Sequence, residues 1–477
     1  MTASLPYAIS ADKLVTNVQE TPSGIRFRIS DEFLFHYITQ TNQIIAEDKL
    51  LSNLNNGGTQ EEGIFNLSEI EYGAPLEECL EMSNGNMENL TLELTRQCNC
   101  RCAYCLYSGA YDNRRRHAEE FMSWNTIWSA LHFYKSHNRK CRRAHISFYG
   151  GEALLAFQKI KNTVEYATNL FARSKPLTFT ISTNGLLLAD KVVAWLEENP
   201  RVSVVITLNG PFHDVHRVTT QGKATLDSIL NNLATIKAEH PAVWNQQVNF
   251  ICNIASLTEV RPLRDFYMNV IGKYPILVTG IHTAHANDQL DKIVKMDQKS
   301  SCRLWYNLAR EYMSTGDDFL HVLFRSRIRH IYNRPIIKKG MPAIAKNCIP
   351  FLSNCFVSSD GAINLCEKIG EMSLGNVVDG IDKQKVKTLM TNAKTAFNQK
   401  CRRCWAQRLC SICFADMDNL LCKTAEIQSE RCRVERENLA VDLVIFVEFA
   451  LLHPKMFDSL YLRSECPECC HSSNEQR

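Results

Sequence analysis

The distribution of cysteine limits what this chain can fold into more than any other feature. Its 477 residues include 20 cysteines, with four between Cys98 and Cys105 and six between Cys401 and Cys432. Disulfide scaffolds are usually short secreted chains, and the opening Met-Thr-Ala-Ser lacks the pattern of a signal peptide. Clustered thiolates in a reducing compartment more often bind zinc or iron. The sequence therefore predicts a cytoplasmic metalloprotein.

Composition and charge argue against several classes of protein. Hydrophobic residues make up 45% of the chain and charged residues 22%, which is typical of a globular protein. The formal net charge of +3 is too small to predict binding to nucleic acid or to a membrane surface. The apolar stretch Leu439–Leu452 is too short to span a bilayer and contains Asp442 and Glu448, so we expect a buried helix there.

Strands and helices are expected to alternate between residues 88 and 285. The strand candidates are short apolar runs, at Leu90–Leu94, His145–Tyr149, Leu177–Ser182, Val202–Leu208, Val248–Asn253 and Leu277–Ile281. Helical spacing fits the segments between them, including Trp124–His137, Leu155–Phe171 and Asp190–Asn199. Repeated strand–helix units predict a parallel sheet with ligands at the carboxyl ends of its strands. We therefore expect an α/β fold with a partial (β/α)6 barrel of the TIM type.

The segments on either side of this barrel are expected to form further domains. Residues 1–87 predict an N-terminal α+β module, because Ile25–Ile29 alternates as a strand does and Phe33–Leu51 has helical spacing. Residues 286–345 predict a helical connector. Residues 346–440 are rich in cysteine and loops, so bound metal would replace part of an apolar core there. Residues 441–477 predict a helix and a tail that contains Cys466, Cys469 and Cys470.

The first cysteine cluster follows the first predicted barrel strand. Cys98, Cys102 and Cys105 are separated by three and two residues. Three thiolates on a short loop can hold three irons of a four-iron cluster and leave the fourth iron open for a ligand. A zinc site is usually closed by four protein ligands, and Cys100 provides a fourth thiol in this loop. Spacing alone leaves both metals open.

Ligand-like motifs also end the next three predicted strands. Gly150, Gly151 and Glu152 follow the second strand, where glycines allow the backbone to approach a ligand and Glu152 can accept from an ammonium group. The third strand ends at Ser182-Thr183-Asn184-Gly185, and the fourth at Asn209, with Arg217 soon after. Each motif alone is also explained by a turn or a surface arginine. Their succession at consecutive strand ends makes zinc binding a poor explanation.

Together these motifs resemble the radical S-adenosylmethionine (radical SAM) superfamily, in which the open iron binds the cofactor and cofactor cleavage supplies a hydrogen-abstracting radical. The resemblance implies an enzyme in which Cys98, Cys102 and Cys105 hold the cluster, with an aromatic residue typical of the position of Tyr104. It also implies the residues that contact SAM, which are Tyr104, Gly150, Gly151, Glu152, Ser182, Asn184 and Arg217.

The cysteines after residue 346 resemble the SPASM extension of peptide-modifying radical SAM enzymes, which carries two auxiliary [4Fe-4S] clusters. The resemblance implies a nearer cluster held by four thiolates, those of Cys348, Cys355, Cys366 and Cys413. It implies a farther cluster held by those of Cys401, Cys404, Cys410 and Cys432. The cofactors would then be three [4Fe-4S] clusters and SAM. In isolation, the two Cys-x-x-Cys pairs also fit zinc ribbons.

The resemblance extends to the substrate and to one catalytic residue. Glu367 follows Cys366, where sulfatase-maturing members have a catalytic Asp, so Glu367 is a candidate for proton transfer. The segment after Cys105 resembles enzymes that mature ribosomally made peptides, which implies a precursor-peptide substrate and a thioether or carbon–carbon cross-link. Residues 1–87 would then suit leader-peptide binding by strand addition. The resemblance further implies a flavodoxin or ferredoxin as electron donor.

Two other functions remain open from the sequence. A sulfatase-maturing enzyme, which converts Cys or Ser to formylglycine, shares the same motifs but generally lacks a long N-terminal module. A non-catalytic zinc- or iron-binding scaffold or redox sensor would explain the cysteines. It would not explain the strand ends at Glu152 and Asn184, because a scaffold has no need of a cofactor cradle.

Overall fold

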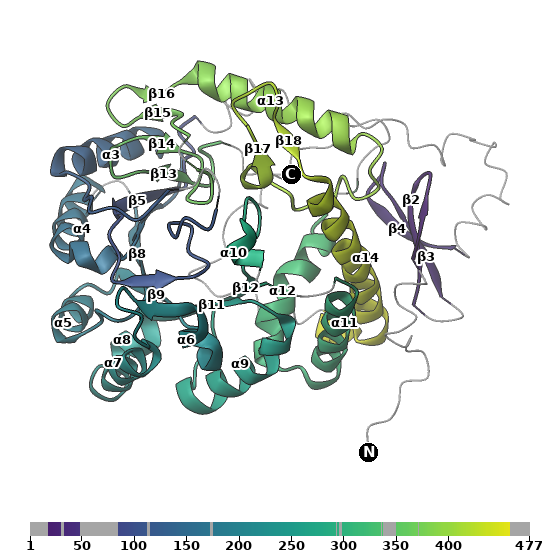
Figure 1. Cartoon of the computed structure of the whole chain (residues 1–477), viewed down its shortest axis with the longest axis horizontal. Helices are drawn as coiled ribbons and strands as arrows, with labels where there is room; N and C mark the ends of the chain where they lie inside the picture. The colour runs from purple at the N-terminus through teal and green to yellow at the C-terminus, as the bar shows by residue number, and fades with distance from the viewer. Residues whose placement is uncertain are drawn as a thin grey trace.

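The structure is a computed structural model, and it describes residues 18–29, 33–47, 84–111, 115–171, 175–291, 293–294, 298–334, 336, 350–370 and 372–457. Cys348 and the tail cysteines Cys466, Cys469 and Cys470 lie outside the described residues. Figure 1 shows a curved sheet with helices along its outer side, a long helix across the top and a small separate sheet beside the last helix.

Six parallel strands form the centre of the molecule, as the sequence predicts. They are β5 (Asn89–Thr95), β7 (Ala144–Gly150), β8 (Leu177–Thr183), β9 (Val202–Thr207), β11 (Val248–Ile254) and β12 (Leu277–Gly280). Each is hydrogen-bonded to the next in chain order. Among the described strands none joins β12 to the opposite edge, so the sheet is an open, partial barrel. The predicted α/β class with a parallel sheet core is confirmed.

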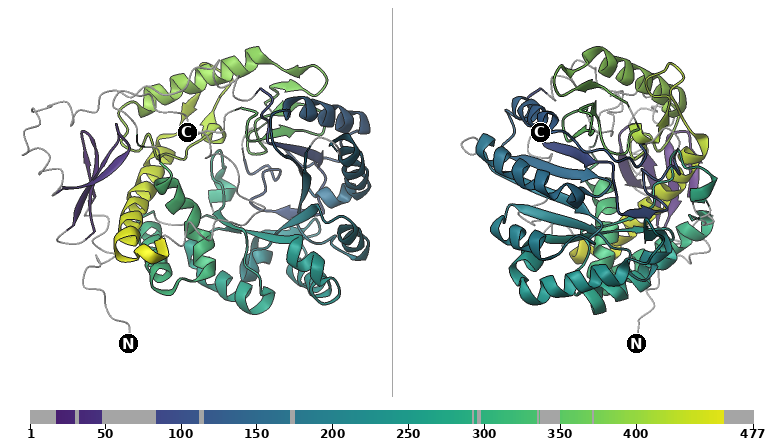
Figure 2. Two further views of the ribbon diagram at one scale, coloured as in Figure 1. Left: turned by 180° about the vertical axis from the view of Figure 1, so that it is seen from behind. Right: turned by 60° about the vertical axis from the view of Figure 1, so that its left-hand side comes forward.

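Helices cover the outer face of this sheet, as Figure 2 shows from two further directions. They are α3 (Trp124–His137), α4 (Phe157–Phe171), α5 (Asp190–Glu198), α6 (His213–His216), α7 (Leu226–Glu239), α8 (Pro241–Gln246) and α9 (Val260–Phe266). In α4 the buried residues Ile160, Val164, Ala167 and Phe171 recur at helical spacing. Burial of such apolar stripes against the strands holds each helix in place.

A hairpin from the C-terminal region extends the same sheet. Strand β13 (Cys355–Val357) runs parallel to β5, and β14 (Ile363–Asn364) pairs antiparallel with β13. The barrel and the cysteine-rich region thus share one sheet and one apolar core. The shared sheet places the turn between β13 and β14 at the carboxyl end of β5, where the backbone N–H of Ser359 donates to Glu93.

The remaining elements of the cysteine-rich region are short strands and two long helices. The strands are β15 (Gly375–Asn376), β16 (Gly380–Ile381), β17 (Met417–Asp418) and β18 (Glu426–Ile427), and the helices are α13 (Lys383–Cys401) and α14 (Ser429–Leu452). The expected boundary between residues 440 and 441 falls inside α14. Cys432 lies in the first turns of α14, so this helix belongs to the cysteine-rich region and to the C-terminal end alike.

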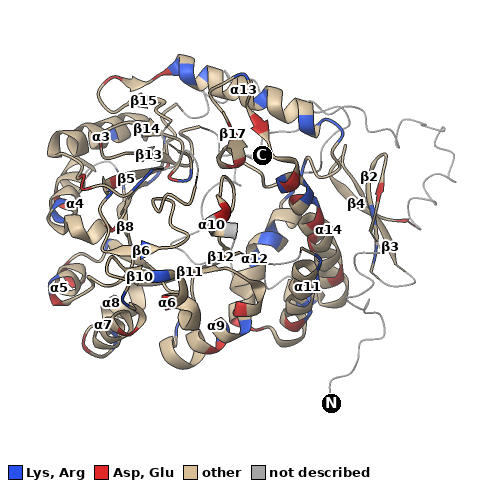
Figure 3. Cartoon of the chain, viewed as in Figure 1, with Lys and Arg blue, Asp and Glu red and all other residues tan. Residues whose placement is uncertain are grey.

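Helix α14 is packed between the connector helices α11 (Gln298–Thr315) and α12 (Asp318–Tyr332), which follow α10 (Asp288–Asp291). Its acidic groups are buried but paired: Asp442 accepts from Trp305 Nε1 at 2.9 Å, and Glu448 accepts from the Tyr306 hydroxyl at 2.7 Å. The predicted buried helix is therefore confirmed. Figure 3 shows acidic and basic residues interspersed along the ribbon of α14. No helix of the described residues is both long and apolar enough to cross a membrane.

The N-terminal segment differs from the prediction. It forms an antiparallel sheet of β1 (Val18–Thr21), β2 (Gly24–Arg28), β3 (Leu34–Ile38) and β4 (Gln43–Ala46), so the helix expected from Phe33 is wrong. Tyr37 explains the outcome: it is fully buried, and its ring centroid lies 6.3 Å from that of Trp405. Aromatic and β-branched residues favour strands when one face packs on another domain, and that packing overrides local helical spacing.

Candidate active site

The loop after β5 carries three of the predicted ligands, Cys98, Cys102 and Cys105. Part of the loop forms β6 (Cys100–Cys102), which pairs antiparallel with β10 (Arg217–Thr219). The backbone N–H of Cys100 donates to Cys98 Sγ at 3.3 Å, and that of Tyr107 donates to Cys105 Sγ at 3.4 Å. Donors aimed at the sulfurs favour the thiolate form, which is the form that binds iron.

Gly150 and Gly151 hold the end of β7 against this loop. A Cβ atom at Gly150 would lie 2.1 Å from the carbonyl oxygen of Thr95, and one at Gly151 would lie 2.3 Å from that of Gln97. The N–H of Gly151 donates to the Thr95 carbonyl at 2.8 Å. These glycines therefore permit a close approach of backbone to backbone, and they fix the loop that carries the cysteines.

Replacing Gly151 with alanine is expected to displace the cysteine loop, because the new methyl group collides with backbone atoms of Gln97. Protein reconstituted with iron and sulfide without oxygen should lose about four irons per chain and the absorbance of one cluster. Gly280→Ala is the matched control, since nothing lies within 4 Å of its added Cβ. Equal iron content in the two variants would contradict this role for Gly151.

Glu152 ties together the ends of β7 and β8. Its carboxylate is fully buried and accepts from Leu154 N at 3.0 Å, Thr183 Oγ1 at 2.8 Å and Asn184 N at 2.8 Å. Burial raises the pKa of this carboxyl group, and the donated hydrogen bonds oppose the rise. Asn184 in turn donates to Asn99 Oδ1 at 2.7 Å in the cysteine loop. The ends of β7 and β8 and the cysteine loop therefore form one connected group.

Arg217 is buried, with 7% of its surface exposed, so the surface-arginine alternative is wrong. It lies opposite Cys102 in the β10–β6 ladder, and its Nη1 donates to the Tyr104 hydroxyl at 3.1 Å. Asn209 Nδ2 donates to the same hydroxyl at 2.6 Å. The pKa of Tyr104 is raised mainly by burial. Arg217 therefore brings a positive charge to the cysteine loop, and its charge lowers the pKa of Cys98 and of Cys102.

Cys100, the fourth thiol of the loop, lies beside Cys98. Their side chains hydrogen-bond to each other, and this bond is the main cause that lowers the pKa of Cys98 and raises that of Cys100. Burial is the main cause that raises the pKa of Cys105, to about 12. Within the described part of the chain, no three His, Cys, Asp or Glu side chains converge as ligands of a single metal ion.

A buried charged group under the loop was missed by the sequence analysis. Glu93 of β5 is fully buried, accepts from the Tyr107 hydroxyl at 2.5 Å and lies 3.4 Å from Arg115 Nε. The second oxygen of Glu93 accepts from the backbone N–H of Ser359 at 3.0 Å. Arg115 belongs to a run of three arginines, which is a pattern typical of a solvated loop, but it is only 4% exposed. The sequence signal for this buried ion pair was a single acidic residue, Glu93, within an otherwise apolar and polar-uncharged strand.

The nearer auxiliary site is seen only in part, because Cys348 lies outside the described residues. Burial raises the pKa of Cys413 to about 12, and the charges of Asp416 and then Cys366 add to the rise. Cys355 begins β13 opposite Leu90 and is fully buried, and burial alone raises its pKa. The shared electrostatic interaction is the observation that relates Cys366 to Cys413.

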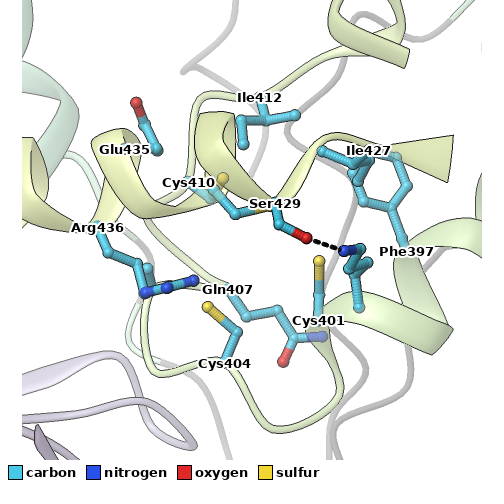
Figure 4. A pocket seen from close by; sticks show the side chains of 13 residues that line it. Phe397, Cys401, Cys404, Gln407, Cys410, Ile412, Ile427, Ser429, Glu435 and Arg436 are labelled. Atoms are coloured by element: carbon cyan, nitrogen blue, oxygen red, sulfur yellow. Dashed lines mark hydrogen bonds between the residues drawn. The ribbon is translucent and has the colours of Figure 1, made fainter. Parts of the chain in front are cut away.

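The farther auxiliary site is described in full. One cavity of about 180 Å³ is lined by all four cysteines predicted for it, Cys401, Cys404, Cys410 and Cys432. Figure 4 shows three of these side chains, labelled, around one space, with apolar and charged neighbours at its edge. They come from the end of α13, the loop after it and the start of α14. Segments 31 residues apart in sequence are therefore joined at one thiol-lined cavity.

The chemistry of these thiols fits an iron–sulfur cluster. Burial raises the pKa of all four thiols, to about 12 for Cys401. Neighbouring thiols add to the rise for Cys401, Cys404 and Cys410. Thiols release their protons when metal binds, and the four thiolates then surround a positive charge. Metal binding would therefore stabilise four cysteines that line one cavity. Soft sulfur ligands select zinc or iron–sulfur clusters over harder ions.

Glu367 lies half-buried in the loop after Cys366. Its charge acts on Tyr149, at the end of β7, whose pKa is raised first by burial, then by Glu367 and then by Cys105. The backbone carbonyl of Glu367 accepts from Arg115 Nη2 at 2.7 Å. Glu367 and Cys105 therefore both lie close enough to Tyr149, which is half-buried, for their charges to raise its pKa.

Comparison with known proteins agrees with this geometry. Residues 92–250 match the family model of the Radical SAM superfamily. A protein of Methanocaldococcus jannaschii is 23% identical over 316 residues, which cover 65% of this chain and 95% of that protein. The Serine-type anaerobic sulfatase-maturating enzyme of Bacteroides thetaiotaomicron is 25% identical over 150 residues, 31% of this chain and 36% of that enzyme. This chain thus matches about a third of that relative's length.

A solved structure shares the fold over most of the chain. Native anSMEcpe with bound AdoMet and Cp18Cys peptide has a TM-score of 0.54 at 17% identity, and the match covers 79% of this chain and 99% of that one. The family match over residues 92–250, the strand order and the cysteine loop agree with one another, and they define the class: this chain is an enzyme that contains a radical SAM domain. Its radical SAM domain implies a [4Fe-4S] cluster and SAM as cofactors.

Proposed function

We propose that this enzyme carries three [4Fe-4S] clusters and modifies a ribosomally made precursor peptide, by forming a thioether or carbon–carbon cross-link within it. The observation that carries the proposal is the second cysteine-lined site. Four half-buried cysteines from two distant segments line one cavity. The cysteine-rich region to which they belong also extends the sheet of the barrel. A radical SAM domain alone has no use for these thiols, whereas peptide-modifying members of the SPASM type do.

The residues at the strand ends would hold the cofactor. Cys98, Cys102 and Cys105 would bind three irons, and SAM at the open iron supplies the hydrogen-abstracting radical when bound. Glu152, buried and already oriented by two backbone donors, would accept from the cofactor's ammonium. Arg217, buried opposite Cys102, would pair with its carboxylate. Gly150, Gly151, Ser182, Asn184 and Tyr104 would complete the cradle.

Glu367 would act as the base that accepts the proton released when the peptide is oxidised. Two observations support this role: Glu367 is half-buried, and its charge reaches Tyr149 at the carboxyl end of β7. Arg115 donates to the backbone carbonyl of Glu367 and not, through this bond, to its carboxylate. The hydrogen bond therefore fixes the loop without using the carboxylate that would accept the proton. A flavodoxin or ferredoxin would donate the electron that starts cofactor cleavage, and the auxiliary clusters would offer a route for the electrons released by peptide oxidation. We propose a cytoplasmic location.

The N-terminal sheet would bind the leader part of the precursor peptide. Its outer strands, β1 and β4, each pair with one neighbour only among the described strands. An edge strand can accept an extended peptide through backbone hydrogen bonds. The peptide bound in anSMEcpe supports a peptide substrate for the shared fold.

Sulfatase maturation is the second candidate function. The similarity to the Serine-type and Cysteine-type anaerobic sulfatase-maturating enzymes over 150 and 139 residues favours it. The two functions differ in their products. A cross-link removes two hydrogens from the peptide and leaves no carbonyl, whereas formylglycine carries an aldehyde that reacts with hydrazines.

The test is iron and sulfide analysis, with 5′-deoxyadenosine release, on protein purified and reconstituted without oxygen. We expect about twelve irons per chain, four for each cluster, and release that depends on dithionite. Mass spectrometry of a co-expressed precursor peptide then measures the modification. Loss of two hydrogens without hydrazine reactivity supports cross-linking. About four irons per chain would refute the auxiliary clusters, and an aldehyde product would establish the second candidate.

Cys404→Ala is expected to remove the farther auxiliary cluster while sparing the radical site. Iron should fall by about four per chain, peptide modification should be lost, and some dithionite-driven cofactor cleavage should remain. Cys141→Ala is the control, because Cys141 lies in the barrel and lines neither site. If Cys404→Ala lost cofactor cleavage as completely as modification while staying folded, the separate roles of the clusters would be refuted.

A further inference from the structure

The N-terminal sheet is attached to the very loop that holds Cys404. Trp405, the next residue, donates from Nε1 to Glu20 Oε1 at 3.0 Å. Its carbonyl accepts from Thr39 Oγ1 at 2.8 Å, and Arg408 Nε donates to the Thr39 carbonyl at 2.7 Å. Figures 1 and 2 agree that this sheet lies beside α14. Strand β1 and the turn after β3 therefore both bind the loop.

Arg436 connects this contact to the thiol-lined cavity. It lies on α14, one turn after Cys432, and it lines the cavity (Figure 4). Its Nε lies 3.8 Å from Glu20 Oε1 on β1. Its guanidinium interacts with the Cys404 thiol through both charge and a side-chain hydrogen bond. Arg436 also lines a second cavity, of about 300 Å³, together with Glu20 and Trp405. The side chain of Arg436 therefore lines both the thiol-lined cavity and the cavity of about 300 Å³.

The other charged side chains of the cavity have partners of their own. Lys400 donates to Ser429 Oγ at 2.5 Å, and Glu435 accepts from the N–H and hydroxyl of Ser411 at 2.8 and 2.7 Å. The charge of Lys400 also acts on Cys401 and Cys432, but among the two cations of the cavity it is Arg436 that also hydrogen-bonds to a cysteine sulfur, that of Cys404. Charge and hydrogen bonds at cluster sulfurs set the reduction potential of a cluster.

We propose that Arg436 sets the reduction potential of the cluster held by Cys401, Cys404, Cys410 and Cys432, and that Glu20 of the N-terminal sheet positions Arg436 for this purpose. The inference rests on the proposed function, which assigns a cluster to this cavity. Reduction adds a negative charge to the cluster, and a cation at its thiolates stabilises the reduced form. Glu20 is a positioning residue, since it acts on the cluster only through Arg436.

Arg436→Gln tests the first part. In anaerobic redox titration followed by electron paramagnetic resonance, the signal of this cluster is identified by its loss in Cys404→Ala. We expect the potential to fall, so that the ratio of reduced to oxidised cluster at a fixed applied potential drops about tenfold. Arg436→Lys keeps the charge and should recover part of the shift. Arg433→Gln is the control: it removes a cation one turn away, whose partners are Glu430 and Glu437.

Glu20→Gln tests the second part by the sign of its effect. Loss of an acidic charge by itself raises a cluster potential, because the reduced form is less repelled. If Glu20 holds Arg436 at the sulfur, the same substitution releases Arg436 and lowers the potential. Glu437→Gln is the control, since Glu437 lines the same 300 Å³ cavity but pairs with Arg433. We expect a fall for Glu20→Gln and none for Glu437→Gln.

Iron content separates the possible failures. If the wild-type protein lacks iron beyond one cluster, the proposed function fails and the inference with it. The role of Arg436 is refuted if Arg436→Gln and Arg433→Gln both keep about twelve irons per chain and Arg436→Gln shifts the potential no more than Arg433→Gln does. A rise in potential for Glu20→Gln would refute positioning by Glu20 and leave only a distant charge effect.

Discussion

Replacing Cys98, Cys102 or Cys105 with alanine is expected to abolish release of 5′-deoxyadenosine. The three thiols lie on one loop that contacts the end of β7 and pairs with β10, so each substitution would remove one of the three proposed iron ligands. Release is measured by chromatography after reconstitution without oxygen and reduction with dithionite. Iron should fall by about four per chain, and the auxiliary clusters should remain.

Cys100→Ala is the control for this loop. Cys100 is a fourth thiol at the same site and hydrogen-bonds to Cys98. If it served as a ligand, its removal would abolish release as the other three do. We expect Cys100→Ala to retain release. Persistent release in any of the Cys98, Cys102 or Cys105 variants would contradict the assignment of the radical site to this loop.

Glu93→Gln is expected to destabilise the protein by about 3 to 5 kcal/mol. The substitution removes the buried carboxylate that balances Arg115 and Arg96, whose side chains are 4% and 14% exposed. An unbalanced buried charge costs far more than an exposed pair contributes. The measurement is the midpoint of denaturant unfolding of the anaerobic holoenzyme, followed by fluorescence and by cluster absorbance.

Glu120→Gln is the matched control for the same charge network. Glu120 also pairs with Arg96, at 3.6 Å, but its side chain is 53% exposed. We expect its substitution to cost less than about 1 kcal/mol, as for other solvent-exposed pairs.

Glu93 also accepts from Ser359, so the loss of its carboxylate should weaken the attachment of the β13–β14 hairpin to the barrel. Equal stability of the two variants would contradict this account.

The sequence predicted the barrel and its ligand-bearing ends because their signals are local. Six apolar runs coincide with six parallel strands, and glycine and small polar residues follow them at the turns. In a parallel sheet the carboxyl ends of the strands share one edge. Glu152 and Asn184 could therefore be assigned to one site without coordinates, and the structure joins them through a hydrogen bond at 2.8 Å.

Interactions between distant segments could not be predicted in the same way. Arg115 belongs to a run of arginines typical of a solvated loop, yet it is buried against Glu93 and reaches the carbonyl of Glu367. The helical spacing after Phe33 gave way to strands because Tyr37 packs on Trp405, 368 residues away. Periodicity describes the faces of one segment and carries no information about its partner.

The sequence by itself indicated the class of chemistry, because the spacing of Cys98, Cys102 and Cys105 occurs together with ligand-like motifs at the ends of the next strands, and both kinds of signal are local. It also identified four cysteines of the farther site. Only the tertiary structure decided that those four line one cavity, that Cys355 starts a strand of the barrel sheet, and that Arg436 connects Cys404 to Glu20. The physical reason is that the spacing of ligands is set by covalent bonds along the chain, whereas the burial and pairing of side chains are set by contacts between segments that are distant in sequence.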